Sequence, residues 1–232
     1  MSEVLLRLRG LTLRRDDGTG SAILNDVDLD LRENDVLILK GRSGSGKTTL
    51  LKCIAQLNVY DKGKVLLNGK EPSEYGLPEY RTKVLYIPQR PSLLPGTPHD
   101  FLRTISSFSS RRGKGRQAST SNEAFDRAVK LARGWGIEPY LWDREWAELS
   151  GGEAQRLGLA VGLGMGGAEV VLLDEPTSAL DEETMKTVEE SMLSLLPNGK
   201  NPDGTLKAFI WITHEASQAD RVGTRTLDIS QQ

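Results

Sequence analysis

The sequence predicts an α/β fold with a mostly parallel core sheet and helices on both faces of that sheet. Strand-like apolar runs alternate with amphipathic, helix-like stretches, as they do in folds whose strands are joined by helical crossovers. The segments 168–176 and 208–214 contain continuous apolar runs, which are typical of strands buried on both faces of a parallel sheet. The length of 232 residues suits one such domain with a small insert.

Strands are expected where apolar residues alternate with polar ones, or run together, between turn-forming residues. Seven segments fit this description: 4–13, 23–40, 63–69, 83–89, 168–176, 208–214 and 224–230. The turn-rich stretch 14–21 separates the first two. The third ends at Asn68-Gly69, a pair that strongly favours the tight turn of a β-hairpin.

Two helices are expected from apolar residues spaced three and four positions apart. In 46–57 these residues are Leu50, Leu51, Ile54 and Leu57, and in 183–196 they are Met185, Val188, Met192 and Leu195. The single cysteine, Cys53, lies among the first set. We expect it to be a buried, unreactive thiol.

The middle third of the chain, about 90–165, is interpreted as a helical insert. Within it, 106–122 is polar, basic and almost free of large apolar residues, so a flexible excursion is expected there. A basic run can also bind nucleic acid or lipid, but a solvated loop is the usual outcome. The net charge of −2 gives no sign of a nucleic-acid surface, and no nucleic-acid partner is expected.

The sequence shows neither a membrane span nor an export signal. Hydrophobic residues make up 38% of the chain, and no apolar run approaches the roughly 20 residues that cross a bilayer. The first 13 residues alternate like a strand and lack the basic, apolar and small-residue order of a signal peptide. A cytoplasmic protein is therefore expected.

The segment Gly41–Thr48, GRSGSGKT, matches the phosphate-binding pattern G-x-x-x-x-G-K-[ST] between an apolar strand and an amphipathic helix. Its glycines let backbone N–H groups face phosphates, Lys47 adds a cation, and the Thr48 hydroxyl is suited to Mg²⁺. We expect ATP to be bound by Gly41, Ser43, Gly44, Ser45, Gly46, Lys47, Thr48 and Thr49.

Two acids follow the apolar run of 168–176. Asp174 stands where a phosphate-binding fold needs a carboxylate for Mg²⁺, and Glu175 is placed to polarise an attacking water. Two acids after a strand can also cap the next helix, but the phosphate loop in the same chain favours catalysis. The sequence thus predicts ATP hydrolysis with Mg²⁺.

A second phosphate cradle is predicted in 148–156, ELSGGEAQR, where a Ser-Gly-Gly loop runs into a helix. Free N–H groups and the positive end of the helix dipole favour an anion at such a place. One bound nucleotide needs only one phosphate-binding loop of this kind, so the second loop points to a second nucleotide.

The chain resembles the ATP-binding subunits of ABC transporters over essentially its whole length. The resemblance rests on six motifs in order: Gly41–Thr48, Gln89 after a strand, LSGGE at 149–153, Asp174–Glu175, SALD at 178–181 and His214 after a strand. It implies a P-loop NTPase of ABC type with an N-terminal antiparallel β subdomain. The implied ATP-binding core is 1–89 and 166–232, and the implied helical signature subdomain is about 90–165.

The resemblance also implies roles for single residues. Gln89 would reach Mg²⁺ and the attacking water, and its loop would sense a membrane partner. His214 would contact the γ-phosphate and Glu175, while Asp181 would lie at a subunit interface. His99 matches no motif, and we expect it to be structural.

The second cradle finds its ligand in this family only when two chains pair. In an ATP-dependent homodimer, or a pair with another ATPase subunit, each signature would close over the nucleotide on the opposite chain. The residues expected to do so are Ser150, Gly151, Gly152 and Glu153. Closure of the pair around ATP would drive the partner.

Two features depart from the family pattern. Arg15 stands where an aromatic residue usually stacks on adenine; a guanidinium can also stack on a base. The helix after the signature is rich in glycine at 158–167, so we expect it to be short or tightly packed.

The expected partner is a separate transmembrane permease, which would hold the chain at the cytoplasmic face of a membrane. The chain also looks like the small stand-alone ATPases associated with metal (iron) export in bacteria and aluminium tolerance in plants. The alternative is a soluble ABC ATPase without transport, such as an iron–sulfur assembly scaffold component. A nucleotide-binding regulator is disfavoured because Glu175 and His214 are both present.

Overall fold

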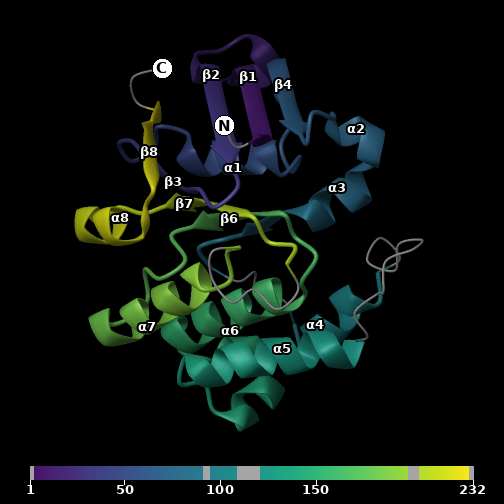
Figure 1. Ribbon diagram of the computed structural model, residues 1–232, viewed down its shortest axis with the longest axis vertical. Helices are drawn as coiled ribbons and strands as arrows, with labels where there is room; N and C mark the ends of the chain where they lie inside the picture. The colour runs from purple at the N-terminus through teal and green to yellow at the C-terminus, as the bar shows by residue number, and fades with distance from the viewer. Residues whose placement is uncertain (1–2, 91–94, 109–120, 198–203, 230–232) are drawn as a thin grey trace.

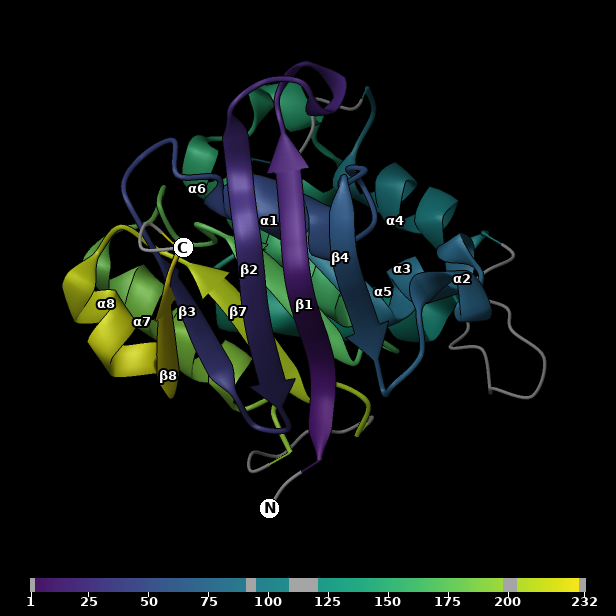
Figure 2. The same ribbon diagram turned by 90° about the horizontal axis from the view of Figure 1, so that it is seen from above.

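Two sheets divide the strands of the chain in the computed structural model, which describes residues 3–90, 95–108, 121–197 and 204–229. The first is a three-stranded antiparallel sheet in the order β2-β1-β4. The second is a five-stranded parallel sheet in the order β5-β6-β7-β3-β8. Figures 1 and 2 show the antiparallel sheet lying above the parallel one. This confirms the expected fold class.

The antiparallel sheet is made of β1 (Val4–Arg14), β2 (Ala22–Arg32) and β4 (Lys62–Leu67). Asn68 and Gly69 form a tight turn with φ of 49° and 76°, and Leu67 and Lys70 exchange backbone hydrogen bonds of 2.9 and 3.0 Å across it. A β-hairpin was expected here, but a helix and not a second strand follows the turn. The chain continues into the short helix α2 (Pro72–Tyr75), and β4 pairs with β1 instead.

The parallel sheet is made of five short strands: β3 (Val36–Lys40), β5 (Val84–Ile87), β6 (Val170–Asp174), β7 (Ala208–Ile212) and β8 (Arg225–Asp228). Every residue of β6 and β7 is buried, as their continuous apolar runs predicted. Because all five strands run in the same direction, the loops that follow them leave one common edge of the sheet. The phosphate loop, Glu175 and His214 follow these strands, and Asp174 is the last residue of β6.

Four layers result from how the helices cover the parallel sheet. Helix α1 (Lys47–Ile54) lies between the two sheets, and one core contains its Leu50 and Leu51 together with Leu37 and Leu172 of the parallel sheet. A second core on the other face of that sheet joins it to helices below. These helices are α4 (Pro98–Ser106), α5 (Ser121–Gly134), α6 (Gly151–Gly164) and α7 (Glu182–Leu193).

The remaining elements are short. They are helices α3 (Leu77–Lys83) and α8 (Ala216–Val222), and the 3₁₀ turns η1 (Asp16–Gly18), η3 (Pro139–Asp143) and η4 (Trp146–Glu148). No helix in the described ranges is long and apolar enough to cross a membrane. Residues 109–120, which make up most of the excursion expected at 106–122, lie outside the described residues. The boundaries proposed at 90 and 165 stay a prediction.

Several local expectations were corrected or refined. Helix α1 ends at Ile54, before Gln56 with φ of 57°, so Leu57 lies outside the helix and is 48% exposed. Leu195 follows the end of α7 and packs against the lower core only in part. Cys53 is buried, and burial raises the pKa of its thiol to about 11, as expected of an unreactive cysteine.

The glycine-rich helix α6 is tightly packed and not short. A Cβ added at Gly164 would lie 2.6 Å from the Cβ of Ala128 on α5. One added at Gly162 would lie 2.7 Å from Ile87 Cδ1 on β5. The two glycines therefore let α6 approach both neighbours more closely than any side chain would permit.

Candidate active site

The phosphate loop connects β3 to α1 and wraps around the side chain of Lys47. Lys47 Nζ donates to the carbonyls of Gly41 at 2.8 Å and Arg42 at 3.1 Å. Gly44 and Gly46 have φ of 79° and 91°, which glycine adopts without strain. No side chain in the described part of the protein caps α1, so its first N–H groups are free to bind an anion.

Two observations show that the loop suits a polyphosphate. Ser45 Oγ is buried and has no hydrogen-bond partner among the described residues, and such groups usually acquire one. A Cβ at Gly44 would meet no atom within 4 Å, so the backbone there is open to a ligand. Of the other expected residues, Ser43 is exposed in the loop and Thr49 is half-buried on α1.

Asp174 is held by two hydroxyl groups at the end of β6. Thr48 Oγ1 donates to its Oδ1 at 3.1 Å, and Tyr86 OH donates to its Oδ2 at 3.0 Å. Burial, together with the nearby Asp174 carboxylate, raises the pKa of Tyr86, so its hydroxyl stays protonated and can donate. Sequence reasoning missed Tyr86; its only signal was a hydroxyl in an apolar strand three residues before Gln89.

The described residues contain no group of three or more His, Cys, Asp or Glu side chains that could hold a metal ion. Thr48 and Asp174 nevertheless fit Mg²⁺, because this ion is commonly bound by one or two carboxylates together with substrate phosphates. Gln89 is also expected at the metal, and that role stays a prediction. Its side-chain amide contacts Glu175 and, at 3.4 Å, Ser178.

Glu175 is placed between Gln89 and His214. Gln89 Nε2 donates to its Oε2 at 2.8 Å, and His214 Nε2 lies 3.0 Å from its Oε1. The backbone of Glu175 has φ of 47°, a conformation that a residue with a side chain rarely adopts. The structure thus brings together Gln89, Glu175 and His214, the three residues expected to be catalytic. Glu175 directly follows Asp174 in the chain, and Asp174 is bonded to Thr48 of the phosphate loop.

Gln155 on α6 connects the loop of Gln89 to the loop between β6 and α7, and it was also missed from the sequence. Its Nε2 donates to the carbonyls of Gln89 at 3.1 Å and Glu175 at 3.0 Å, and its Oε1 accepts from the N–H of Ala179 at 2.9 Å. Only 5% of Gln155 is exposed. A buried amide with both ends paired fixes the loops that it joins.

Ser150 and Glu153 close the N-terminus of α6 on itself. Ser150 N donates to a Glu153 carboxylate oxygen at 2.8 Å, and Glu153 N donates to Ser150 Oγ at 3.3 Å, which is a capping box. Hydrogen bonds from the Ser150 backbone and side chain to the Glu153 carboxylate hold the pKa of Glu153 below its usual value. Gly152 lies against the next motif, since a Cβ there would be 3.1 Å from the Ala179 carbonyl oxygen.

The remaining expected site residues lie apart from the catalytic group. Asp181 caps α7 by accepting from Thr184 N at 2.9 Å and Thr184 Oγ1 at 2.8 Å, which lowers its pKa. Arg15 is exposed at the start of η1, where its carbonyl accepts from the N–H groups of Gly18 and Gly20. His99 lies 3.2 Å from Asp143 and packs on Phe125, in keeping with a structural role.

A family model described as ABC transporter matches residues 24–178. The ergothioneine transport ATP-binding protein EgtV of Helicobacter pylori is 33% identical over 90% of this chain and 90% of its own length. The general L-amino acid transport ATP-binding protein AapP of Rhizobium johnstonii is 30% identical over 90% of the chain and 76% of its own length.

Protein STAR1 of Oryza sativa is 34% identical over 94% of this chain, and the chain spans 58% of STAR1. Among solved structures, the dimeric post-hydrolysis state of the ATP-binding cassette MJ0796 bound to ADP and Pi has a TM-score of 0.79. It covers 97% of this chain and 94% of the cassette at 24% identity. That likeness establishes the fold.

Proposed function

The chain belongs to the ABC transporter family as an ATP-binding and ATP-hydrolysing subunit, and we propose that it powers a transporter whose membrane-spanning part is a separate protein. The observation that carries the proposal is the position of Glu175. Its carboxylate lies between Gln89 and His214, one residue after the acid bonded to Thr48 of the phosphate loop.

The loop residues bind the triphosphate, and Glu175 accepts a proton from the attacking water. Lys47, Ser45 Oγ and the N–H groups of α1 supply positive charge and donors for the phosphates. Gln89 and His214 hold the Glu175 carboxylate so that it faces one water. Thr48 and Asp174 would hold Mg²⁺, which when bound neutralises phosphate charge. Arg15 would stack on the adenine.

A second copy of the chain, or a related ATPase subunit, completes each site. Helix α1, which follows the phosphate loop, and helix α6, which begins in the signature, lie on opposite faces of the parallel sheet. This separation supports the proposal that the signature contacts a nucleotide bound to another chain. Ser150, Gly151 and Gly152 of one chain would close over the ATP held by the loop of the other. Asp181 would lie at this interface.

The membrane partner would dock beside Gln89. An apolar groove of about 310 Å³ lies between β5, α4 and α6. Its walls include Tyr86, Pro88, Phe101, Trp146, Met165 and Pro176. Aromatic and apolar side chains thus form most of the surface offered to the partner. Docking would hold the chain at the cytoplasmic face of a membrane.

Recovery of the partner tests the transport role. Affinity purification of the tagged chain from detergent-solubilised membranes is expected to recover a multi-spanning protein, and Phe101→Asp in the groove should reduce that recovery strongly. Tyr140→Asp is the control, because Tyr140 is an aromatic residue that is already 60% exposed and lies outside the groove. Recovery of soluble proteins alone would instead support the iron–sulfur scaffold alternative, which no observation on the described residues favours.

A further inference from the structure

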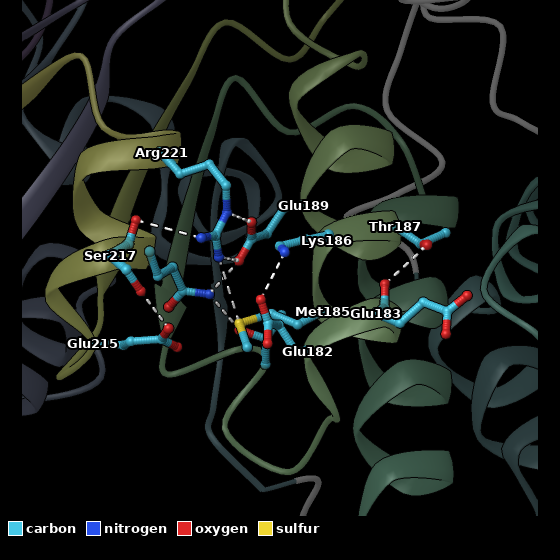
Figure 3. A network of polar contacts seen from close by, with 11 residues as sticks. Glu182, Glu183, Met185, Lys186, Thr187, Glu189, Glu215, Ser217 and Arg221 are labelled. Atoms are coloured by element: carbon cyan, nitrogen blue, oxygen red, sulfur yellow. Dashed lines mark hydrogen bonds and ion pairs between the residues drawn. The ribbon is translucent and has the colours of Figure 1, made fainter.

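A buried polar network joins the segment after Glu175 to the helix after His214. Figure 3 shows the part of this network that contains Glu189 and Arg221. Gln218, the third residue of α8, donates from Nε2 to Thr177 Oγ1 at 2.7 Å and to Glu189 Oε1 at 2.7 Å. Thr177, Gln218 and Glu189 are each at most 3% exposed. These contacts connect α7, α8 and the loop of Glu175 in the protein interior.

Arg221 completes the network and compensates the buried charge of Glu189. Its Nε donates to Glu189 Oε2 at 2.6 Å and its Nη2 to Glu189 Oε1 at 2.9 Å, a bidentate pair. Arg221 Nη1 also contacts the Ser217 carbonyl at 3.4 Å. An unpaired carboxylate at this depth would be costly, and the bidentate pair offsets that cost. The Gln218 amide nitrogen donates to both Thr177 and Glu189, and Arg221 holds Glu189 in place, so the orientation of the amide is fixed.

Two contacts thus tie the same two segments together. The outer one is His214 with Glu175, whose side chains are 50% and 23% exposed. The inner one is Gln218 with Thr177, and it is buried. A pair exposed to water is weakly held, whereas a buried hydrogen bond is stronger and more directional. The inner contact is therefore suited to set the spacing of the outer one.

We propose that Gln218 is a positioning residue for ATP hydrolysis: through Thr177 it sets the position of the His214 imidazole against the Glu175 carboxylate. Glu189 and Arg221 act through Gln218 by fixing its amide. The inference rests on the proposed function, because it assigns the His214–Glu175 pair to hydrolysis. It adds to that function a structural role for the Gln218–Thr177 hydrogen bond, which lies behind the residues proposed to act on the nucleotide.

Histidine NMR tests the positioning directly, without any enzymatic activity. The chain has two histidines, so ring-labelled protein gives two sets of signals, and His214→Ala assigns them. Thr177→Val removes the acceptor of Gln218 while keeping the shape of the side chain. It is expected to shift the His214 signals and leave those of His99 in place. Thr187→Val is the matched control, since Thr187 is an exposed threonine on α7.

Turnover tests the consequence for catalysis. Thr177→Val is expected to lower kcat on the order of tenfold, as small displacements of catalytic groups do, with the Kd for ATP unchanged. In a His214→Ala background the same substitution should cause little further loss, because Gln218 acts through His214. Thr177→Ser keeps the hydroxyl and should retain most of the activity. Thr187→Val should match the wild type.

The outcomes separate this inference from the proposed function. Unmoved His214 signals in Thr177→Val, or a full tenfold loss that persists in the His214→Ala background, would overturn the inference. So would shifted signals with unchanged kcat. A wild-type chain without ATPase activity would refute the proposed function. The NMR comparison would still show whether the Gln218–Thr177 contact positions His214. If Thr177→Val fails to fold, Thr177→Val with Gln218→Met replaces both polar partners by apolar groups and should show the same two effects.

Discussion

The Tyr86 hydroxyl on β5 donates a hydrogen bond of 3.0 Å to Asp174 at the C-terminal end of the neighbouring strand β6. The other oxygen of Asp174 is held by Thr48 at 3.1 Å. Neither donor carries a charge, so the two hydrogen bonds fix the orientation of the carboxylate without pairing it with a cation. Tyr86 also lines the groove proposed for the membrane partner, so Asp174, the acid proposed to hold Mg²⁺, lies one side chain away from that surface.

Tyr86→Phe removes only the hydroxyl and is expected to weaken the response to Mg²⁺. One neutral hydrogen bond contributes about 1 kcal/mol, so the Mg²⁺ concentration for half-maximal turnover should rise by roughly fivefold. The Kd for ATP without Mg²⁺ should stay the same. Tyr75→Phe is the control, because the Tyr75 hydroxyl bonds to the Leu67 carbonyl away from the site. An unchanged Mg²⁺ titration would remove Tyr86 from the metal site.

Glu175→Gln should leave ATP binding intact and nearly abolish hydrolysis, because glutamine keeps the shape of the side chain but cannot accept a proton from water. Equilibrium binding of a fluorescent ATP analogue and phosphate release measure the two effects separately. Turnover equal to that of the wild type would show that another group acts as the base.

Glu169 is expected to make folding stability depend on pH. Burial raises its pKa, but the hydrogen bonds from Lys83 and Asn68 and the charges of Lys83 and Lys207 outweigh burial and lower it below 4.5. A depressed carboxyl pKa contributes stability that is complete above the unfolded value and is lost as the pH falls through the folded one. Stability should therefore decline below about pH 4.5 as this contribution is lost.

Glu169→Gln tests this contribution by urea unfolding. The substitution leaves Lys83, whose side chain is 11% exposed, without its ion-pair partner, so we expect a loss of about 3 kcal/mol at pH 7. The difference from the wild type should shrink as the pH falls below 4.5, because the wild type then also loses the contribution of Glu169. A difference that stays the same size from pH 7 downward would contradict the assignment. Glu182→Gln is the control, since Glu182 forms an exposed pair with Lys186.

Gly164→Ala should destabilise the protein although alanine favours helix. The added Cβ would lie 2.6 Å from Ala128 Cβ and 2.7 Å from its backbone, and such overpacking costs about 1–3 kcal/mol. Gly134→Ala is the matched control, because a Cβ there meets no atom within 4 Å. It should be neutral or stabilise by up to about 1 kcal/mol. Equal effects of the two substitutions on urea unfolding would refute close packing of α5 and α6.

The sequence predicted those parts of the site that local pattern encodes. The phosphate loop needs glycines between a strand and a helix, and the acids need a buried strand before them; both requirements are visible in the letters of 41–48 and 168–175. The same holds for the fully buried strands β6 and β7. These motifs meet at one edge because parallel strands bring their following loops together.

The side chains that hold the motifs in place could not be predicted from the sequence. Gln155 and Gln218 are polar residues on helices, where most such residues face water. What distinguishes them is burial against loops far along the chain, which only the packing of α6 and α8 reveals. Leu57 shows the reverse error, because the apolar spacing continued past the residue at which the helix ends.

Gly151→Asp tests which nucleotide the signature serves. Gly151 is the first residue of α6, and a Cβ there would meet only Ala179 Cβ at 3.8 Å, an ordinary contact. An aspartate at a helix N-terminus is favourable, so the monomer should fold and keep its ATP affinity. Across a closed dimer, however, its charge would face the phosphates on the other chain and oppose closure.

The measurement is gel filtration of the Glu175→Gln chain with and without ATP and Mg²⁺. The parent is expected to shift from monomer to dimer with ATP, and Gly151→Asp should abolish the shift. Gly151→Asn, which has the same size without the charge, should retain a substantial part of the dimer. Loss of ATP affinity by the Gly151→Asp monomer would mean that the signature acts on its own nucleotide. Equal loss of the dimer in both variants would assign the effect to side-chain size, because charge repulsion requires the aspartate to be the worse of the two.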